Sequence, residues 1–185
     1  MISDTLREAE QKMDKAIAVT REDFATIRTG RAHPSMFHKI NADYYGSPTP
    51  LQQLASFTVP EARIIIISPY DQSAMSSIEK AIRDSDLGVN PANDGKVLRC
   101  VFPELTEDRR EDYIKLARHK AEEGRVSVRN IRRHAKQALD RLEKDGEVGK
   151  DDVTGAEKRL DGITKKHTEA IDEMLKNKEA ELLEV

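Results

Sequence analysis

All seven prolines of the chain lie between residues 34 and 103, and this confinement divides the sequence into two kinds of structure. Because proline removes a backbone donor and breaks helix interiors, long helices can form only outside this segment. Charged side chains make up 13 of the 70 residues in the segment but 52 of the other 115. Six of the eight phenylalanines and tyrosines also lie in it. We therefore expect a small inserted domain between two highly charged helical flanks.

Three long amphipathic helices are expected in the flanks, because apolar residues recur there at intervals of three and four. Their apolar stripes run from Leu6 to Ile27, from Tyr113 to Leu142 and from Val153 to Met174. The first helix should end near Gly30, and the second should run from a cap at Thr106 to a stop at Asp145-Gly146. One-sided helices bury their stripes against one another. The flanks are therefore predicted to form one three-helix bundle, residues 1–30 and 105–185, with residues 31–104 inserted.

The insertion is expected to be a small domain of strands and one helix, which makes the fold class α+β. Strands are predicted over residues 36–45, 54–59, 62–68 and 96–102, and a helix over residues 73–85 that Asp71 introduces. In the last strand, Leu98, Cys100 and Phe102 share one face. This placement makes Cys100, the only cysteine, a core residue.

The stretch from Gly124 to Leu139 contains no acidic residue, although 34 of the 185 residues are acidic and the net charge is −3. On a helix, one face with an arc of about 60° would carry Arg118, Arg125, Arg129, Arg132 and Lys136, with Arg133 at its edge. Like charges at such spacings cost roughly 0.2–0.5 kcal/mol per pair, and a merely solvated face would interleave glutamate. Regularly spaced guanidinium groups suit phosphate oxygens. The pattern therefore favours structured RNA as a partner.

No pattern typical of an enzyme or a metal site is present. The nearest phosphate-loop candidate has six residues between Gly88 and Gly95 where the motif requires four, and Val97 replaces the hydroxyl residue that would hold magnesium. The five histidines show no ligand spacing, and His167 lies on an apolar stripe as a core or boundary residue. No run of 18 apolar residues and no signal peptide is found. We expect a cytoplasmic protein without catalytic residues, metal, cofactor, small-molecule substrate or membrane contact.

The segment Tyr44–Pro50 places two adjacent tyrosines beside two prolines. Exposed aromatic side chains there would form a contact surface. Alternatively, Tyr44 packs inward and Tyr45 outward, as alternation along a strand would require.

In combination, several motifs resemble the bacterial ribosome recycling factor family over the whole chain. They are Arg28-Thr29-Gly30-Arg31-Ala32-His33-Pro34, Tyr44-Tyr45-Gly46 with Thr49-Pro50-Leu51 and Gln53-Leu54-Ala55, Asp86-Leu87-Gly88 with Asn90-Pro91, Leu105-Thr106-Glu107-Asp108-Arg109-Arg110, and Val126-Ser127-Val128-Arg129-Asn130-Ile131-Arg132-Arg133. The resemblance implies an L-shaped protein in which a three-helix bundle carries an inserted β/α/β domain. It also implies binding to the post-termination ribosome and, with elongation factor G and GTP, separation of the subunits, without hydrolysis by the factor itself.

The resemblance assigns expected roles to individual residues. It implies that Arg129 and Arg132 contact large-subunit ribosomal RNA and that Arg28 and Arg31 lie at the junction end of the bundle. Arg133 and Arg125 join the RNA-binding set because of the helical periodicity. The inserted domain, by resemblance, faces elongation factor G and the small subunit. His134 stands where the family often has an acid, so we expect a modest, pH-dependent gain in positive potential there.

The two connections between bundle and insertion are expected to pass close together, which would allow a paired hinge. Its residues are Arg31, Ala32, His33, Pro34, Pro103, Glu104 and Leu105. A fixed, packed junction is the alternative.

Two other functions are compatible with parts of the pattern. A helical scaffold could bind acidic protein surfaces through its arginines, and an RNA chaperone would also be basic but usually carries disordered basic tails that this sequence lacks. We expect a monomer.

Overall fold

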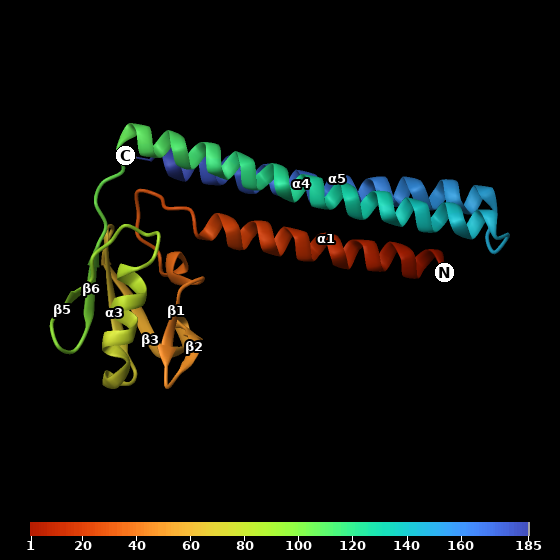
Figure 1. Cartoon of the computed structure of the whole chain (residues 1–185). Helices are drawn as coiled ribbons and strands as arrows, with labels where there is room; N and C mark the ends of the chain where they lie inside the picture. Colours follow the sequence, from red (N-terminus) through yellow and green to blue (C-terminus); the bar gives the residue numbers. More distant parts are fainter. Residues whose placement is uncertain (185) are drawn as a thin grey trace. The chain divides into compact units, whose positions relative to one another are not determined.

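The computed structural model describes residues 1–184, which divide into two compact units. The first unit comprises Met1–Phe24 and Lys115–Glu179, and the second comprises Ala25–Ile114 together with residues 180–184. Figure 1 shows the helices and strands that make up each unit.

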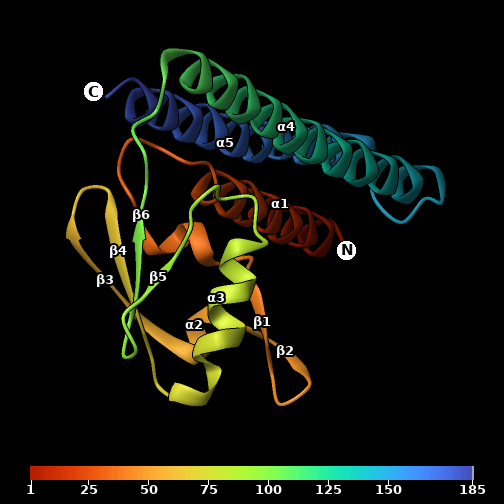
Figure 2. The ribbon, with the colours of Figure 1, turned by 60° about the vertical axis from the view of Figure 1, so that its left-hand side comes forward.

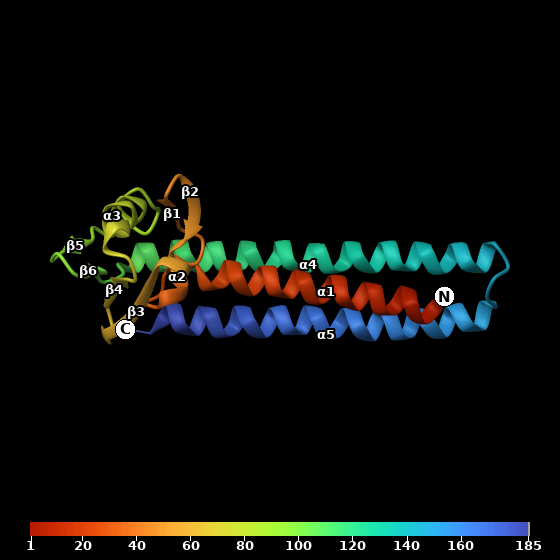
Figure 3. The same cartoon turned by 90° about the horizontal axis from the view of Figure 1, so that it is seen from below.

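Three long helices supply the first unit and run side by side (Figure 3). They are α1 (Ile2–Ala25), α4 (Glu107–Lys144) and α5 (Lys150–Leu183). The buried residues of α1 are spaced by three and four, and the residues are Leu6, Ala9, Met13, Ile17, Thr20 and Phe24. On α4 the buried residues are Ala117, Ala121, Gly124, Val128, Ala135 and Leu139. The predicted three-helix packing is therefore confirmed, because each helix buries one apolar stripe.

Within the apolar stripe predicted from Tyr113 to Leu142, the spacing of three and four residues places Ala138 inward, and this is wrong. Ala138 is exposed, and Leu139 is fully buried in its place. Burying the larger Leu139 side chain removes more apolar surface from water, so the helix turns that side chain inward.

The ends of α4 agree with the caps that the sequence predicts. The Arg109 amide donates to the Thr106 hydroxyl over 3.2 Å, which satisfies one free donor of the first turn. At the other end Gly146 has φ of 73°, and its amide donates to the Glu143 carbonyl over 3.0 Å. Glycine supplies this left-handed C-terminal cap without strain.

The first helix ends earlier than predicted, at Ala25 rather than near Gly30. The Ser35 hydroxyl donates to the Ala25 carbonyl over 3.2 Å, so a residue ten positions later satisfies a carbonyl at the helix end. Arg28 in turn donates to the Pro103 carbonyl. These tertiary hydrogen bonds replace the helical ones, and Arg28 and Arg31 consequently lie in an irregular segment.

The second unit contains two antiparallel sheets and the short helices α2 and α3 (Figure 2). The strands are β1 (Asn41–Tyr44), β2 (Ser47–Pro50), β3 (Ala55–Glu61), β4 (Ile64–Pro69), β5 (Ala92–Asn93) and β6 (Leu98–Val101). β1 and β2 form a hairpin, and the other four strands form a sheet in the order β3-β4-β6-β5. The helices are α2 (Leu51–Leu54) and α3 (Met75–Arg83), and short 3-10 turns span Pro34–Phe37 and Gln72–Ala74. The α+β class is confirmed.

The core of this unit lies between α3 and one face of the four-stranded sheet. Ile78 and Ile82 of α3 are fully buried together with Ile67 and Cys100 of the sheet. Burial raises the pKa of the Cys100 thiol to about 11, so the thiol is protonated at neutral pH. Its predicted role as a core residue is confirmed.

Several strand predictions need correction. The strand expected over residues 36–45 begins only at Asn41, because Pro34–Phe37 forms a 3-10 turn that buries Met36 and Phe37. β2 and β5 were not predicted. β2 contains two prolines, which a two-stranded hairpin tolerates because each strand has one edge without a partner.

The helix after Asp71 is confirmed in part. The Ser73 amide donates to Asp71 Oδ1 over 2.9 Å, as a capping residue requires. This cap begins a 3-10 turn, and the α-helix proper covers only Met75–Arg83 of the predicted 73–85.

Candidate nucleic-acid interface

The predicted basic face is present on α4, in the first unit. Along this face the residues Arg118, Arg125 and Arg132 follow one another at intervals of seven, about two helical turns. They therefore lie nearly above one another. Arg129 and Arg133 lie between and beyond these positions on the same helix.

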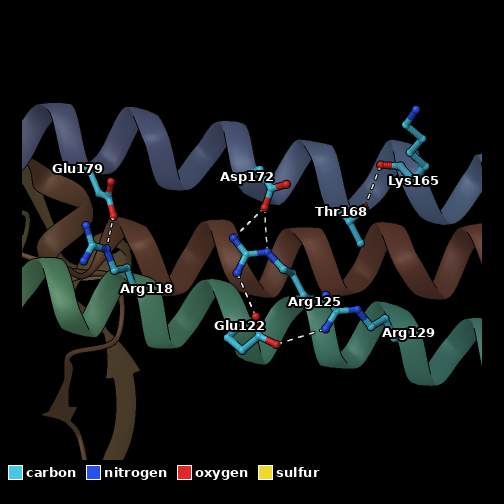
Figure 4. A network of polar contacts seen from close by, with 8 residues as sticks. All are labelled: Arg118, Glu122, Arg125, Arg129, Lys165, Thr168, Asp172 and Glu179. Carbon is cyan, nitrogen blue, oxygen red and sulfur yellow. Dashed lines mark hydrogen bonds and ion pairs between the residues drawn. The ribbon is translucent and has the colours of Figure 1, made fainter.

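This face is not free of acids in three dimensions, because α5 supplies them. The ion pairs between the helices are Arg118–Glu179, Arg125–Asp172, Arg132–Asp161 and Lys136–Glu157, with N···O distances of 2.6, 2.7, 2.7 and 3.6 Å. The residue numbers of the α5 partners fall as the residue numbers along α4 rise, as antiparallel helices require. We call these four pairs the ion-pair ladder, and Figure 4 shows its first two.

The ladder corrects the expectation that repulsion between the α4 cations is uncompensated. That expectation rests on the acid-free stretch and favours a phosphate partner. Carboxylates of α5 in fact compensate much of it. A window along α4 could not reveal them, because the partner acids lie roughly 20–60 positions later in the chain.

Glu122 links Arg125, which belongs to the ladder, to Arg129, which does not. Its two carboxylate oxygens accept from Arg125 Nη1 over 3.1 Å and from Arg129 Nη1 over 3.2 Å (Figure 4). Hydrogen bonds from Arg125 and then Arg129 lower the pKa of the Glu122 carboxyl below its usual value. Glu122 is therefore ionised at neutral pH and holds the two guanidinium groups a turn apart.

The predicted RNA-binding arginines of α4 differ in how many donors remain available. Arg125 bonds through Nε, Nη1 and Nη2, and its side chain is only 19% exposed. Arg132 uses Nε and Nη2 on the single oxygen Asp161 Oδ1. Arg129 bonds only through Nη1 and is 55% exposed. Arg133 is exposed, and within residues 1–184 it has no ion pair. Arg129 and Arg133 thus present the most unused donors.

The other two predicted RNA-binding residues, Arg28 and Arg31, lie in the second unit. The Arg28 guanidinium carbon is 5.6 Å from the centre of the Phe102 ring, and Nη2 donates to the Pro103 carbonyl. Burial lowers the pKa of Arg28 from its usual value. Arg31 is exposed, and its carbonyl accepts from the Thr29 hydroxyl over 3.0 Å. Arg28 therefore ties the segment after α1 to Pro103, a residue of the predicted hinge, whereas the Arg31 side chain reaches solvent.

Two smaller predictions can be compared directly with the structure. His167 is buried, with Nε2 2.6 Å from Asp14 Oδ1 and Nδ1 2.7 Å from the Ile163 carbonyl, which confirms a core or boundary position. Tyr44 is half-buried and Tyr45 is 83% exposed, as the inward and outward placement predicts, but Tyr45 lies in the turn after β1 and not on a strand.

Residues 1–184 contain no group of three or more potential metal ligands. In the same range, none of the helices combines the length and the apolar character needed to cross a bilayer.

Comparison with known proteins shows similarity along the full chain. Residues 20–183 match the model of a family described as ribosome recycling factor. The ribosome-recycling factor of a Nocardioides species is 78% identical over 185 residues, and that of Kineococcus radiotolerans is 68% identical over 185 residues, with 100% of each chain covered in both comparisons.

Two solved structures are also similar. The solution structure of a ribosome recycling factor is 38% identical, with a TM-score of 0.81 and coverage of 100% of this chain and 98% of that one. The second is the T. thermophilus ribosome recycling factor, from models of that factor and E. coli elongation factor G bound to the E. coli post-termination complex. It is 40% identical, with a TM-score of 0.71 and complete coverage of both chains.

Proposed function

The chain belongs to the ribosome recycling factor family, and we propose on this basis that it recycles ribosomes after termination. In this role it binds the post-termination ribosome in the cytoplasm. With elongation factor G and GTP, it promotes separation of the subunits and release of messenger and transfer RNA. The 78% identity to a ribosome-recycling factor over the complete chain carries this proposal. The factor itself has no enzymatic activity, in keeping with its family.

The α4 face is proposed as the docking surface for large-subunit ribosomal RNA. Arg129 and Arg133 donate to phosphate oxygens through the guanidinium nitrogens that the protein leaves unused. Arg132 joins them by exchanging Asp161 for a phosphate. Arg125 acts chiefly by holding α4, α5 and Glu122 together, because its donors are already occupied.

Arg28 and Arg31 are proposed as a second, smaller contact. Arg31 is the stronger candidate of the two because its side chain is exposed. Arg28 contributes by fixing its segment to the Pro103 carbonyl.

We further propose a hinge at Arg31–Pro34 and Pro103–Leu105, between a bundle of residues 1–30 and 105–185 and an insertion of residues 31–104. The hydrogen bond from Arg28 to Pro103 supports it, since this bond keeps the two connecting segments adjacent during any motion. Small-angle scattering under two solution conditions tests it. An interdomain angle that stays constant would instead indicate a fixed junction.

A pelleting assay distinguishes recycling from the scaffold function. Purified post-termination ribosomes are sedimented with the parent chain and with Arg132→Ala. The parent should sediment with the ribosomes, and the variant should remain largely in the supernatant. A parent chain that does not sediment would favour a scaffold for acidic proteins.

A further inference from the structure

Glu122 is an acidic residue on the face of α4 that is proposed to dock phosphate. Its carboxylate repels phosphates, so electrostatics alone would exclude an acid from this position. Both of its oxygens bind arginines of the same face, since they accept from Arg125 Nη1 over 3.1 Å and from Arg129 Nη1 over 3.2 Å. The acid is therefore part of the arrangement of the cations.

The first of these arginines is anchored to a second helix. Arg125 Nε donates to Asp172 Oδ1 on α5 over 2.8 Å, and Nη2 lies 2.7 Å from the same oxygen. Asp172, Arg125, Glu122 and Arg129 therefore form one continuous chain of contacts, which we call the Arg129 tether (Figure 4). An isolated surface ion pair orders its side chains poorly, whereas a network of several charges orders them better. The tether thus connects the exposed Arg129 side chain to a mostly buried one.

The tether leaves one edge of the Arg129 guanidinium group free. Glu122 contacts only Nη1, and Nε and Nη2, which share an edge of the guanidinium plane, have no acceptor within residues 1–184. Two donors on one edge match two oxygens of a phosphate. Arg132 differs, because Asp161 already occupies that edge of its guanidinium group. Glu122 therefore restricts Arg129 without occupying the donors that a phosphate needs.

Two opposing effects determine how Glu122 changes the affinity for RNA. Repulsion in water between charges several ångströms apart, screened by salt, changes an affinity by about twofold. Ordering a free, flexible side chain at the moment of binding costs about two- to tenfold in affinity. Because the second effect is the larger, an acid that orders Arg129 beforehand strengthens the binding of phosphate.

We propose that Glu122 is a positioning residue for RNA docking, which strengthens the contact between Arg129 and phosphate despite its own negative charge. The proposal rests on the proposed function, because the phosphates are those of ribosomal RNA. Removal of this acid should therefore weaken binding to a polyanion, which is the opposite of what its charge alone predicts.

Equilibrium binding to post-termination ribosomes tests the sign of the effect. Glu122→Gln keeps the size of the side chain, removes its charge and leaves one oxygen acceptor for two arginines. We expect the Kd of this variant to rise by about two- to fivefold. A Kd that is equal to that of the parent chain, or lower, would overturn the proposal.

Asp140→Asn is the matched control for the loss of one negative charge. Asp140 lies about five helical turns after Glu122 on the same side of α4, and its side chain is 49% exposed against 54% for Glu122. It pairs with Lys136 and not with Arg129. The Kd of Asp140→Asn should therefore stay unchanged or fall by up to about twofold. An equal rise in Kd for both variants would also overturn the proposal.

A double-mutant cycle separates positioning from a general loss of structure. When Arg129→Ala is already present, Glu122→Gln should no longer weaken binding, because no guanidinium group remains to be positioned. The same fold-change in both backgrounds, in variants that urea unfolding shows to be folded, would overturn the proposal. If Arg129→Ala alone binds as the parent does, the positioning role fails while the recycling function stands. A parent chain that does not bind ribosomes overturns the proposed function and this proposal with it.

Discussion

At Gly124 the backbone of α4 approaches α1 so closely that a side chain does not fit. A Cβ atom there would overlap the Thr20 hydroxyl oxygen and would lie 3.2 Å from Ile171 Cδ1 on α5. Thr20 cannot easily move, because it is buried and its hydroxyl donates to the Ala16 carbonyl over 3.0 Å. Glycine in a helix interior costs about 1 kcal/mol relative to alanine. At Gly124 the close packing of α1, α4 and α5, which only glycine permits, offsets that cost.

Gly124→Ala should therefore destabilise the protein by about 1–3 kcal/mol despite alanine's better helix propensity. Gly155 and Gly162 on α5 are matched controls, since a Cβ at either position would meet nothing within 4 Å. Alanine at these controls should stabilise by up to about 1 kcal/mol. Urea unfolding of the three variants measures the difference, and stabilisation by all three would show that the helices do not meet at Gly124.

Asp71 should make the unfolding free energy depend on pH in acid. The folded state holds the pKa of Asp71 below its usual value, chiefly through hydrogen bonds from Ser73. Because the folded-state value is the lower one, this stabilisation is complete above the unfolded-state pKa and is lost as pH falls through the folded-state pKa. The stability difference between the parent and Asp71→Asn should therefore shrink below about pH 4. Asp43→Asn is the control, and a difference that stays constant down to pH 2 would exclude this role.

At the scale of elements, apolar spacing predicted the helices well and the strands less well. The caps Thr106 and Gly146 act through neighbouring residues, so the sequence alone located both ends of α4. The end of α1 depends on Ser35 and Pro103, which reach it only through tertiary folding. β2 was missed because its two prolines argue against a strand unless the pairing partner is known. The α5 acids of the ladder were missed for a similar reason, since antiparallel pairing sets their positions.

The arginines of α4 should separate into two classes on substitution. Arg125→Ala should lower the unfolding free energy by about 1 kcal/mol or more, because it breaks bonds to Asp172 and Glu122 from a mostly buried side chain. Arg129→Ala should leave stability within about 0.5 kcal/mol of the parent and weaken ribosome binding. Urea unfolding and ribosome pelleting measure the two quantities. Equal effects of both variants on both quantities would contradict the division of roles.

At the scale of the whole molecule, charge is concentrated in the helical flanks, which hold 52 of the 65 charged residues. The net charge of −3 gives no general attraction to RNA, so binding must depend on the local face of α4. Ribosome affinity should then fall steeply with salt, by roughly 0.7–0.9 in log K per unit of log salt concentration for each phosphate contact. The slope for Arg129→Ala should be smaller by about one contact. A flat salt dependence would rule out phosphate docking.

Reconstituted subunit splitting tests the recycling function most directly. Post-termination ribosomes are mixed with this chain, elongation factor G and GTP, and dissociation into subunits is followed by light scattering while each component is omitted in turn. We predict rapid splitting only when all three are present, with a marked loss of rate for Arg132→Ala. Splitting at the full rate without this chain would contradict its role as a recycling factor.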